Sequence, residues 1–297
     1  MHALKGLPPR CPTISQIGGA TWSISDKLPD RAFNPSIAYS KKYGYAMVVR
    51  RTNYWLDTSY GSLSIHSGAR GVRNVTEFVR LDEELNPVEV SRVKFVDGPK
   101  LIRGLEDCRL VTRGGEWYLN AVMLEQETPR ARICLYSMSN DLEASHVETF
   151  EGADVNKPEK NWMTQLDADS PQFDFVKGGP DGIRGGSCLI PYKNGYLALC
   201  HKTYLETFEY YNPMTFGIQN GVKRNYTHLF VAYDLELNMV ATSDEFTFGP
   251  EGGIEFGSGL IQKDNNLYIT YGVNDKESWM AKIEITKIEK LMKELNK

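Results

Sequence analysis

The sequence predicts an all-β fold, a five-bladed β-propeller with a C-terminal helix. Three observations support this prediction. Over most of the chain, short runs of β-branched and aromatic residues alternate with turns of Gly, Asn, Asp or Lys, which is typical of many antiparallel strands. A unit of strand, polar turn and strand recurs along the chain, with an aromatic residue at the start of its second strand. Helical periodicity is almost absent until the C-terminal end.

Five copies of this unit account for the predicted blades. They cover residues 35–51, 108–124, 161–176, 187–203 and 259–274. A hairpin cannot bury both of its faces alone, and radial repetition of such sheets around a channel leaves only short, protected edges. The 297 residues leave about 59 per blade, enough for four strands. The interval between the third and fourth copies is too short for a full blade, and a β-sandwich is the alternative fold.

The two ends of the chain differ from the repeats. Residues 1–32 precede the first hairpin and are expected to form an N-terminal arm. Near the other end, Ile288, Leu291, Met292 and Leu295 follow the helical spacing i, i+3, i+4, i+7 and predict a helix over about 286–297. Because no Pro- or Ser-rich linker divides the chain, we expect a single propeller domain spanning 1–297.

The composition excludes several functional classes. The chain has 34 Lys and Arg against 38 Asp and Glu, a net charge of −4, and no basic block, which argues against nucleic acid as a partner. No run of 18 apolar residues and no apolar signal region occur, so no membrane span is expected and the predicted location is cytoplasmic. The five cysteines form no C-x-x-C and no His pair has metal-ligand spacing, so no metal and no cofactor are expected. The oligomeric state stays open.

The densest charged cluster lies between Arg103 and Leu110 and leads into a predicted strand. Strand alternation places Glu106 with Cys108 on one face and Asp107 with Arg109 on the other. A carboxylate held between arginines at a channel mouth would be ionised, unless burial or a ligand raised its pKa. A glycosidic oxygen leaves only when it is protonated, which needs such a group. The structural alternative is an ion-paired turn at a blade entrance.

Three segments offer groups for binding anions or hydroxyls. Lys160 opens the third repeat, Arg184 with two glycines opens the fourth, and His201 lies at the end of the fourth. The glycines would allow close approach of backbone amides, and the guanidinium of Arg184 suits a phosphate or carboxylate. Two adjacent glycines before a strand are also typical of a bulge, and a single His in an apolar strand is often a core residue.

Aromatic and acidic residues near turns complete the candidates. Trp55, Trp162 and Trp279 lie beside turns rather than at strand centres, where their rings could stack on sugar C–H groups, although a propeller core also needs aromatic residues. Glu255 and Asp275 flank the last hairpin, near strand ends.

These motifs together resemble a known family. Five motifs follow one another in a fixed order along the chain. They are Phe33-Asn34-Pro35, the Gly-x-Glu-Asp-x-Arg cluster ending at Arg109, the strand ending at His201, the segment from Tyr226 to Asp234 and the Tyr-Gly-x-x-Asp sequence ending at Asp275. That order resembles the five-bladed propellers of glycoside hydrolase family 130. It is also similar to the β-1,2-mannosyltransferases and phosphorylases of glycosyltransferase family 108. The resemblance spans about residues 33–283.

The resemblance implies an inverting reaction in which Asp107 is the general acid, directly or through a sugar hydroxyl. It implies that Lys160 and His201 bind the attacking phosphate, with Arg51 and Arg184 as further candidates. Taken together with the residues discussed above, the predicted substrate-binding positions are Asn34, Arg51, Glu106, Arg109, Lys160, Trp162, Arg184, His201, Tyr226, Glu255 and Asp275. The sequence departs from the family pattern at three places. The family's Glu-Asp-Pro-Arg is Glu-Asp-Cys-Arg in this chain, and the family's Tyr-Gly-Ala-Ala-Asp is Tyr-Gly-Val-Asn-Asp. The Arg-Gly-Gly-Ser sequence that opens the fourth repeat also differs from the family. These departures leave the donor and acceptor open.

The sequence therefore predicts an enzyme that makes or breaks a glycosidic bond with inversion: a glycoside phosphorylase or glycosyltransferase for mannose-like sugars. Its expected partner is a sugar or glycan together with phosphate, a sugar-1-phosphate or a nucleotide-sugar. One alternative is a glycoside hydrolase of the same fold, which needs a second carboxylate about 6.5–9.5 Å from the acid; Glu255 and Asp275 are the candidates. The other is a non-catalytic propeller that binds glycans or proteins.

Overall fold

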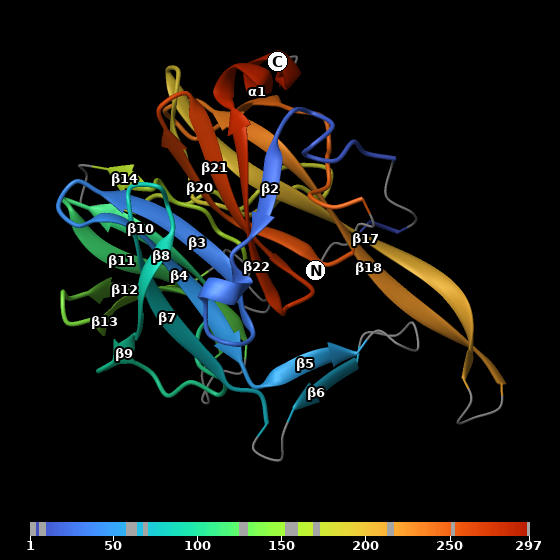
Figure 1. Ribbon diagram of the computed structural model, residues 1–297, viewed down its shortest axis with the longest axis horizontal. Coiled ribbons are helices and arrows are strands. Elements are labelled where there is room, and N and C mark those ends of the chain that lie inside the picture. Colours follow the sequence, from blue (N-terminus) through green and yellow to red (C-terminus); the bar gives the residue numbers. More distant parts are fainter. Residues whose placement is uncertain are drawn as a thin grey trace.

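The computed structural model describes residues 4–5, 10–57, 64–67, 71–124, 130–151, 160–168, 173–212, 217–250 and 253–295. The described chain is built mainly of strands arranged as a β-propeller, as the sequence predicts, with one α-helix (Figure 1). No helix among these residues is long and apolar enough to cross a membrane.

Four antiparallel sheets form the blades found in the described residues. The first contains β3 (Ala32–Ser40), β4 (Gly44–Thr52), β7 (Asn74–Leu81) and β8 (Pro87–Arg92). The second contains β10 (Glu106–Arg113), β11 (Glu116–Leu124), β12 (Ala131–Met138) and β13 (Glu143–Phe150), with β9 (Lys94–Phe95) and β14 (Asp167–Ala168) at its edges. The third contains β17 (Gly195–Asn212), β18 (Gly217–Tyr233) and β19 (Met239–Thr242), joined by β1 (Leu4–Lys5), β15 (Arg184–Gly185), β16 (Ile190–Tyr192) and β23 (Lys293–Glu294). The fourth contains β20 (Glu255–Lys263), β21 (Asn266–Val273), β22 (Glu277–Glu284) and β2 (Ala20–Ser23).

The described residues form four blades where the sequence predicts five, because within them the third repeat builds no sheet of its own. Its first strand is reduced to isolated bridges, Met163 to Val176 and Gln165 to Leu189. The same segment donates and accepts main-chain bonds on both sides: the Thr112 N–H donates to the Leu166 carbonyl, and the Leu189 N–H donates to the Thr164 carbonyl. The segment therefore fills the gap between the second and third blades. The short interval to the next repeat is the physical reason, since too few residues separate them for four strands.

The N-terminal stretch takes part in the propeller. Its strand β2 pairs antiparallel with β22, the last long strand of the chain, with Trp22 opposite Met280. In Figure 1 the blue β2 lies beside the red β22. Part of the stretch expected as an arm, residues 20–23, thus completes the fourth blade, which joins the start of the described fold to its end.

The C-terminal helix is shorter than the spacing of its apolar residues predicts. Helix α1 spans Ile285–Leu291, and of its residues only Ile288 is buried. Residues 293–294 form β23, which pairs with β19. The predicted helix does not continue through residues 292–295, because Lys293 and Glu294 gain main-chain bonds with the third blade instead. One 3₁₀ turn, η1 (Ser25–Lys27), and one separate hairpin, β5 (Tyr54–Asp57) with β6 (Ser64–Ser67), complete the described elements.

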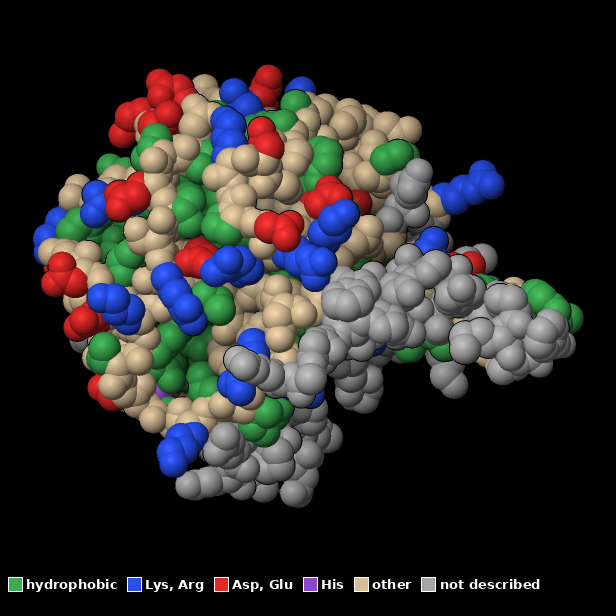
Figure 2. Space-filling model, turned by 60° about the horizontal axis from the view of Figure 1, so that its bottom comes forward, with side chains coloured by type: hydrophobic (Ala, Val, Ile, Leu, Met, Phe, Trp, Pro, Cys, Tyr) green, Lys and Arg blue, Asp and Glu red, His purple; other side chains and the backbone are tan. Residues whose placement is uncertain are grey.

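The core lies between the blades and consists of residues from their inner and middle strands. Ile37, Leu110, Leu199 and Leu260, one from each blade, are at most 1 % exposed and belong to one apolar cluster. The third blade differs from the others because β17 and β18 continue as a long hairpin beyond the body of the propeller (Figure 1; Figure 2), with β1 paired to β17 at Tyr204 and Leu205.

Candidate functional site

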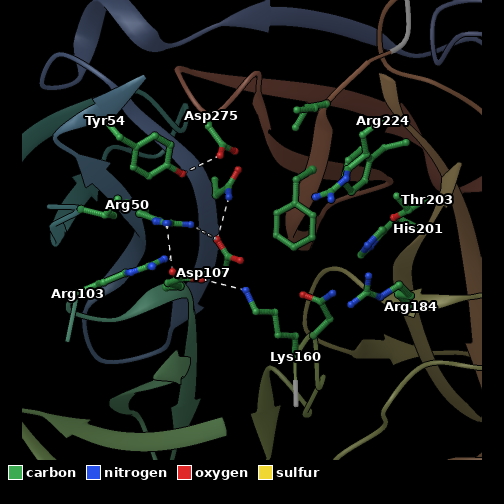
Figure 3. Close-up of a pocket in the computed structure, with 17 residues that line it drawn as sticks. Arg50, Tyr54, Arg103, Asp107, Lys160, Arg184, His201, Thr203, Arg224 and Asp275 are labelled. Atoms are coloured by element: carbon green, nitrogen blue, oxygen red, sulfur yellow. Dashed lines mark hydrogen bonds and ion pairs between the residues drawn. The ribbon is translucent and has the colours of Figure 1, made fainter. Parts of the chain in front are cut away.

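The candidate site is a pocket where all four blades meet, with a volume of about 270 Å³. Figure 3 shows its labelled side chains converging on one cavity. The lining residues are Asn34, Arg50, Tyr54, Val72, Arg103, Glu106, Asp107, Lys160, Asn161, Arg184, His201, Thr203, Arg224, Tyr226, Ile254, Phe256 and Asp275.

β-Bulges in the inner strands place several of these side chains. The pairing of β3 with β4 shifts between Phe33 and Ser36, and that of β10 with β11 shifts between Glu106 and Arg109. Asn34 and Asp107 lie at these bulges with φ values of 50° and 49°, a left-handed conformation that is uncommon for residues other than glycine. Such backbone strain persists only where the surrounding structure enforces it, and it clusters at functional sites.

The bulge corrects the predicted alternation in the acidic cluster. Glu106 and Asp107 both line the pocket, whereas a regular strand would send them to opposite faces. Cys108 is buried and Arg109 is 1 % exposed. Arg109 donates from Nε to the carbonyl of Gly186 and from Nη1 to the carbonyl of Asp107, at 3.4 Å. It lies beneath the pocket rather than in its wall and links the bulge to the neighbouring blade.

One side of the pocket is a network of carboxylates tied to Arg50. The guanidinium of Arg50 lies 3.1 Å from Asp107 Oδ1 and 3.7 Å from Glu106 Oε1, and Asn34 Nδ2 donates to the same Asp107 oxygen at 2.9 Å. Lys160 Nζ donates to Glu106 Oε2 at 3.0 Å. These contacts hold the carboxylate of Asp107 in a single orientation, facing the cavity (Figure 3).

The two aspartates of this side have opposite pKa shifts. Burial acts to raise the pKa of Asp107, but the charges of Arg50 and Lys160 and the bond from Asn34 outweigh it, so the pKa lies below its usual value. Burial raises the pKa of Asp275, and the charge of Arg50 and the bond from Tyr54 offset only part of that effect. Tyr54 donates its hydroxyl proton to Asp275 Oδ2 at 2.7 Å. Asp107 is therefore ionised in the free pocket, beside a carboxyl that binds its proton more tightly.

The opposite side of the pocket is cationic and carries Arg184, His201, Thr203 and Arg224 (Figure 3). In the part of the chain that the structure describes, neither Arg184 nor Arg224 has a carboxylate within ion-pair distance. Burial lowers the pKa of Arg184, and the nearby charge of Arg224 lowers it further. Two like charges held together without a counterion are suited to an anionic ligand.

His201 also lies on the cationic side of the pocket, and its imidazole ring is neutral. Burial, followed by the charges of His228, Arg184 and Arg109, lowers its pKa well below the usual value. Its Nδ1 atom and the hydroxyl of Thr203 are buried and have no hydrogen-bond partner in the described structure. Buried polar atoms are rarely left without partners, so these two atoms mark a polar region of the protein directly behind the cationic side.

Most predicted site residues meet in this pocket. Eight of them line it: Asn34, Glu106, Asp107, Lys160, Arg184, His201, Tyr226 and Asp275. Four predicted positions lie elsewhere: Arg51, Arg109, Trp162 and Glu255. Trp162 is 4 % exposed and packs under Lys177, whose Nζ lies 4.0 Å from the centre of its ring.

Arg51 and Glu255 are engaged outside the pocket. Arg51 pairs with Glu77 at 2.7 Å, and its neighbour Arg50 takes the place in the pocket. Glu255 accepts main-chain N–H bonds from Phe248 and Gly249 at 2.8 and 2.7 Å. Burial raises the pKa of Glu255 to about 7, and these two bonds act against that rise.

Sequence reasoning missed Arg50, Tyr54, Arg103, Thr203 and Arg224 as lining residues. For two of them a signal exists. Thr203 follows His201 by two residues on β17, and Arg224 precedes Tyr226 by two on β18, so each pair shares one face of its strand. No group of three or more His, Cys, Asp or Glu side chains in the described ranges is arranged to hold a metal ion.

Comparison with known proteins supports the fold. No family model matches the chain, and no curated protein sequence matches it. Among solved structures, β-1,2-mannobiose phosphorylase from Listeria innocua, in complex with β-1,2-mannobiose, aligns at a TM-score of 0.60 and 13% identity over 91% of this chain and 92% of its own. The chain has the fold of the family 130 glycoside hydrolases.

Two further structures share this family 130 fold. The first is described in connection with the GH130 family of mannoside phosphorylases. That family contains glycoside hydrolases that target β-1,2 mannosidic linkages in Candida mannan. The first structure aligns at a TM-score of 0.58 and 13% identity over 86% of this chain and 85% of its own. The other is MPT-4, a mannose phosphorylase from Leishmania mexicana in complex with a phosphate ion, at a TM-score of 0.52 and 11% identity over 90% and 87%.

Proposed function

We propose that the chain is an inverting glycoside phosphorylase that acts on mannosides. The observation that carries this proposal is the division of one pocket into a carboxylate side, oriented by Arg50, and a cationic side with two arginines that have no ion-pair partner among the described residues. The first suits acid–base chemistry at a glycosidic oxygen, and the second suits a phosphate. The shared fold supports the same reading, since structures with that fold include a mannobiose phosphorylase and a mannose phosphorylase holding phosphate.

In the proposed phosphorolysis, a phosphate oxygen held by Arg184 and Arg224 attacks the anomeric carbon on the face opposite the leaving sugar. The glycosidic C–O bond breaks as the leaving oxygen takes a proton from Asp107, which must first be protonated from solvent, and the proton that hydrogen phosphate releases when the sugar phosphate forms returns to solvent, so that the two protons balance. Because the charge of Arg50 holds the pKa of Asp107 low, the free pocket contains the carboxylate. That form accepts a proton from an acceptor hydroxyl, so it favours the reverse reaction, synthesis from a sugar-1-phosphate.

The pocket favours phosphate over water as the nucleophile. A hydrolase of this type needs a second carboxylate across the sugar to activate water. Among the described lining residues, Glu106, Asp107 and Asp275 all belong to the side of Arg50, which interacts with all three. The opposite side carries arginines, and Glu255, one candidate water-activating residue, lies outside the pocket. The phosphates of a nucleotide-sugar could bind to the same two arginines. The experiment below therefore also tests transfer from a nucleotide-sugar donor.

The test measures release of mannose-1-phosphate from β-1,2-mannobiose in the presence and absence of phosphate. We expect turnover that depends on phosphate. Arg184→Ala and Arg224→Ala should each raise the KM for phosphate about ten- to a hundredfold, as loss of a bond to a charged group does. Arg80→Ala is the matched control, since Arg80 lies on the first blade and pairs with Glu89. Asp107→Asn should abolish turnover.

Other results would replace the proposal. Equal turnover without phosphate would identify a hydrolase, and turnover only with a nucleotide-sugar would identify a transferase. Binding of mannosides by both wild type and Asp107→Asn, without turnover of any donor, would indicate a binding propeller.

A further inference from the structure

The pocket contains one amide that the contacts described above do not use. Asn161 lines the pocket and is 6% exposed. Its side-chain amide makes no hydrogen bond to any described residue, and it is not among the polar side-chain atoms that are closed off from solvent. The small surface that Asn161 exposes therefore includes its amide. Because polar groups inside a protein nearly always have partners, an amide that is open to the cavity is available to a ligand.

The main chain holds Asn161 in a strained conformation. Its φ is 62°, in the left-handed region that asparagine enters more readily than most residues, but still at a cost. Both neighbours are fixed: Lys160 Nζ donates to Glu106 Oε2 at 3.0 Å, and the carbonyl of Trp162 accepts from Asn120 Nδ2 at 3.1 Å. These contacts leave the amide of Asn161 few positions. Backbone strain of this kind clusters at functional sites.

Asn161 lies where the carboxylate side and the cationic side of the pocket meet. Lys160, which precedes it, pairs with a carboxylate of the first side. The carbonyl of Asn161 packs against Gly185, where an added Cβ would lie 2.1 Å from the oxygen. Gly185 follows Arg184, a residue of the cationic side, in β15. Figure 3 shows Lys160 between Asp107 and Arg184. The segment between the second and third blades thus joins the acid to the anion-binding arginine.

A ligand group at this junction lies next to the reacting carbon. This inference rests on the proposed function, in which the leaving oxygen and the phosphate occupy opposite faces of the anomeric carbon. The neighbours of that carbon in the ring are the ring oxygen and the carbon that bears the 2-hydroxyl. The ring oxygen gains positive charge in the transition state, so it is a poor target for the N–H donors of an amide. The hydroxyl both donates and accepts, as the amide does.

We propose that Asn161 is a specificity-determining residue that binds the 2-hydroxyl of the transferred sugar. Hydrogen bonds to this hydroxyl strengthen in the transition state of glycosidic cleavage. A fixed amide also selects among sugars, because the 2-hydroxyl is axial in mannose and equatorial in glucose and one amide position suits only one of them. A site built to bond a hydroxyl rejects a sugar that lacks it. The amide of Asn34 cannot replace that of Asn161, since it already donates to Asp107.

The test removes the residue and the hydroxyl separately and together. 2-Deoxyglucose-1-phosphate is mannose-1-phosphate without its 2-hydroxyl, and Asn161→Gly removes the amide at a position where glycine adopts the same φ without strain. With mannose as the acceptor, Asn161→Gly should lower kcat/KM for mannose-1-phosphate about ten- to a hundredfold. It should change kcat/KM for the deoxy donor by less than about threefold, and the ratio of the two effects cancels the different intrinsic reactivities of the donors.

Asn120→Ala is the matched control. Asn120 is 1% exposed and holds the same segment through the carbonyl of Trp162, and it does not line the pocket. A purely structural effect on the segment lowers kcat/KM for both donors by the same factor, and we expect this of Asn120→Ala. Equal losses for the two donors in Asn161→Gly, or no loss for mannose-1-phosphate, would overturn the proposal.

A binding measurement separates failure of this proposal from failure of the proposed function. If wild type turns over neither donor, the chain is not a mannoside phosphorylase, and isothermal titration calorimetry with mannose and 2-deoxyglucose replaces the kinetics. Wild type should then bind mannose about tenfold more tightly than 2-deoxyglucose, and Asn161→Gly should bind both alike. Equal or undetectable affinities in wild type, or a preference for mannose that Asn161→Gly retains, would show that Asn161 does not bind the 2-hydroxyl, whatever reaction the pocket catalyses.

Discussion

Replacement of Arg50 by methionine tests how much the buried ion pair of the pocket contributes to stability. Arg51 provides the comparison, because it is adjacent in sequence but pairs with a different carboxylate nearer the surface. Arg50 has 10% of its side chain exposed and lies 3.1 Å from Asp107 Oδ1. Two unit charges at that distance attract by about 5 kcal/mol at an effective dielectric constant near 20. Loss of one partner from a buried pair costs about 3–5 kcal/mol, because the other charge stays buried and unpaired. We therefore expect Arg50→Met to lose about 3–5 kcal/mol of unfolding free energy at pH 7.

The sign of the pH dependence follows from the pKa of Asp107. In wild type the folded-state pKa lies below its ordinary value, so the stability that this group contributes is present above pH 4 and is lost as the pH falls through the folded pKa. In Arg50→Met, we expect burial to outweigh the remaining charge of Lys160 and the bond from Asn34 and to raise the pKa of Asp107 above the unfolded value. The variant should then regain stability as the pH falls from 7 to 4.5, because the protonated carboxyl needs no partner.

The assay is urea unfolding of both proteins at pH 7 and pH 4.5, with Arg51→Met as the matched control. Arg51 pairs with Glu77, but 40% of its side chain is exposed, so solvent screens the pair and we expect a loss of about 1 kcal/mol or less. Turnover of mannobiose should fall sharply in Arg50→Met only. Equal losses in the two variants, or a loss in Arg50→Met that does not change with pH, would refute the reasoning.

Three further predictions concern residues that lie outside the pocket lining. Gly272→Ala should lower the free energy of unfolding by about 1–3 kcal/mol and should lower kcat. A Cβ at position 272 would lie 2.1 Å from Asn34 Oδ1 and displace the amide that orients Asp107. An unchanged kcat would show that the orientation of Asp107 does not matter. Burial raises the pKa of Glu255 to about 7, so the folded state holds its proton more tightly than the unfolded state. In urea titrations, the unfolding free energy of wild type should therefore fall by up to about 3 kcal/mol relative to Glu255→Gln as the pH rises from 4.5 to 7.5. Parallel stability curves for the two proteins would contradict this. Burial lowers the pKa of His228 to about 3, so the stability that it contributes is present above pH 6.5 and lost below it. The drop in Tm between pH 7 and pH 5 should therefore be smaller in His228→Gln than in wild type, and an equal drop would mean that another group is responsible.

The sequence alone determined the fold class and part of the candidate site. Alternating apolar runs and repeated hairpins are local properties, so they predict strands and blades without knowledge of long-range contacts. Asp107, Glu106, Lys160, Arg184 and His201 were found because each opens or ends a repeat, and equivalent ends of propeller strands meet at one mouth.

The tertiary structure decided which side chains face the cavity. A side chain's face depends on strand register, and one extra residue in a bulge reverses it. The bulges at Asn34 and Asp107 are held by contacts between blades, so the spacing of residues could not show that Glu106 joins Asp107 in the pocket. For the same reason the sequence selected Arg51, whereas the register of β4 brings Arg50 to the carboxylates.

The number of blades and the ends of the fold also depend on long-range contacts. The third repeat carries the local pattern of a hairpin but bridges its neighbours instead, because the main-chain groups of residues 161–166 find partners on two sides. The last turn predicted for the C-terminal helix becomes strand β23, since β19 offers a free edge. A local pattern states what a segment can form; the free energy of pairing with distant strands decides what it does form.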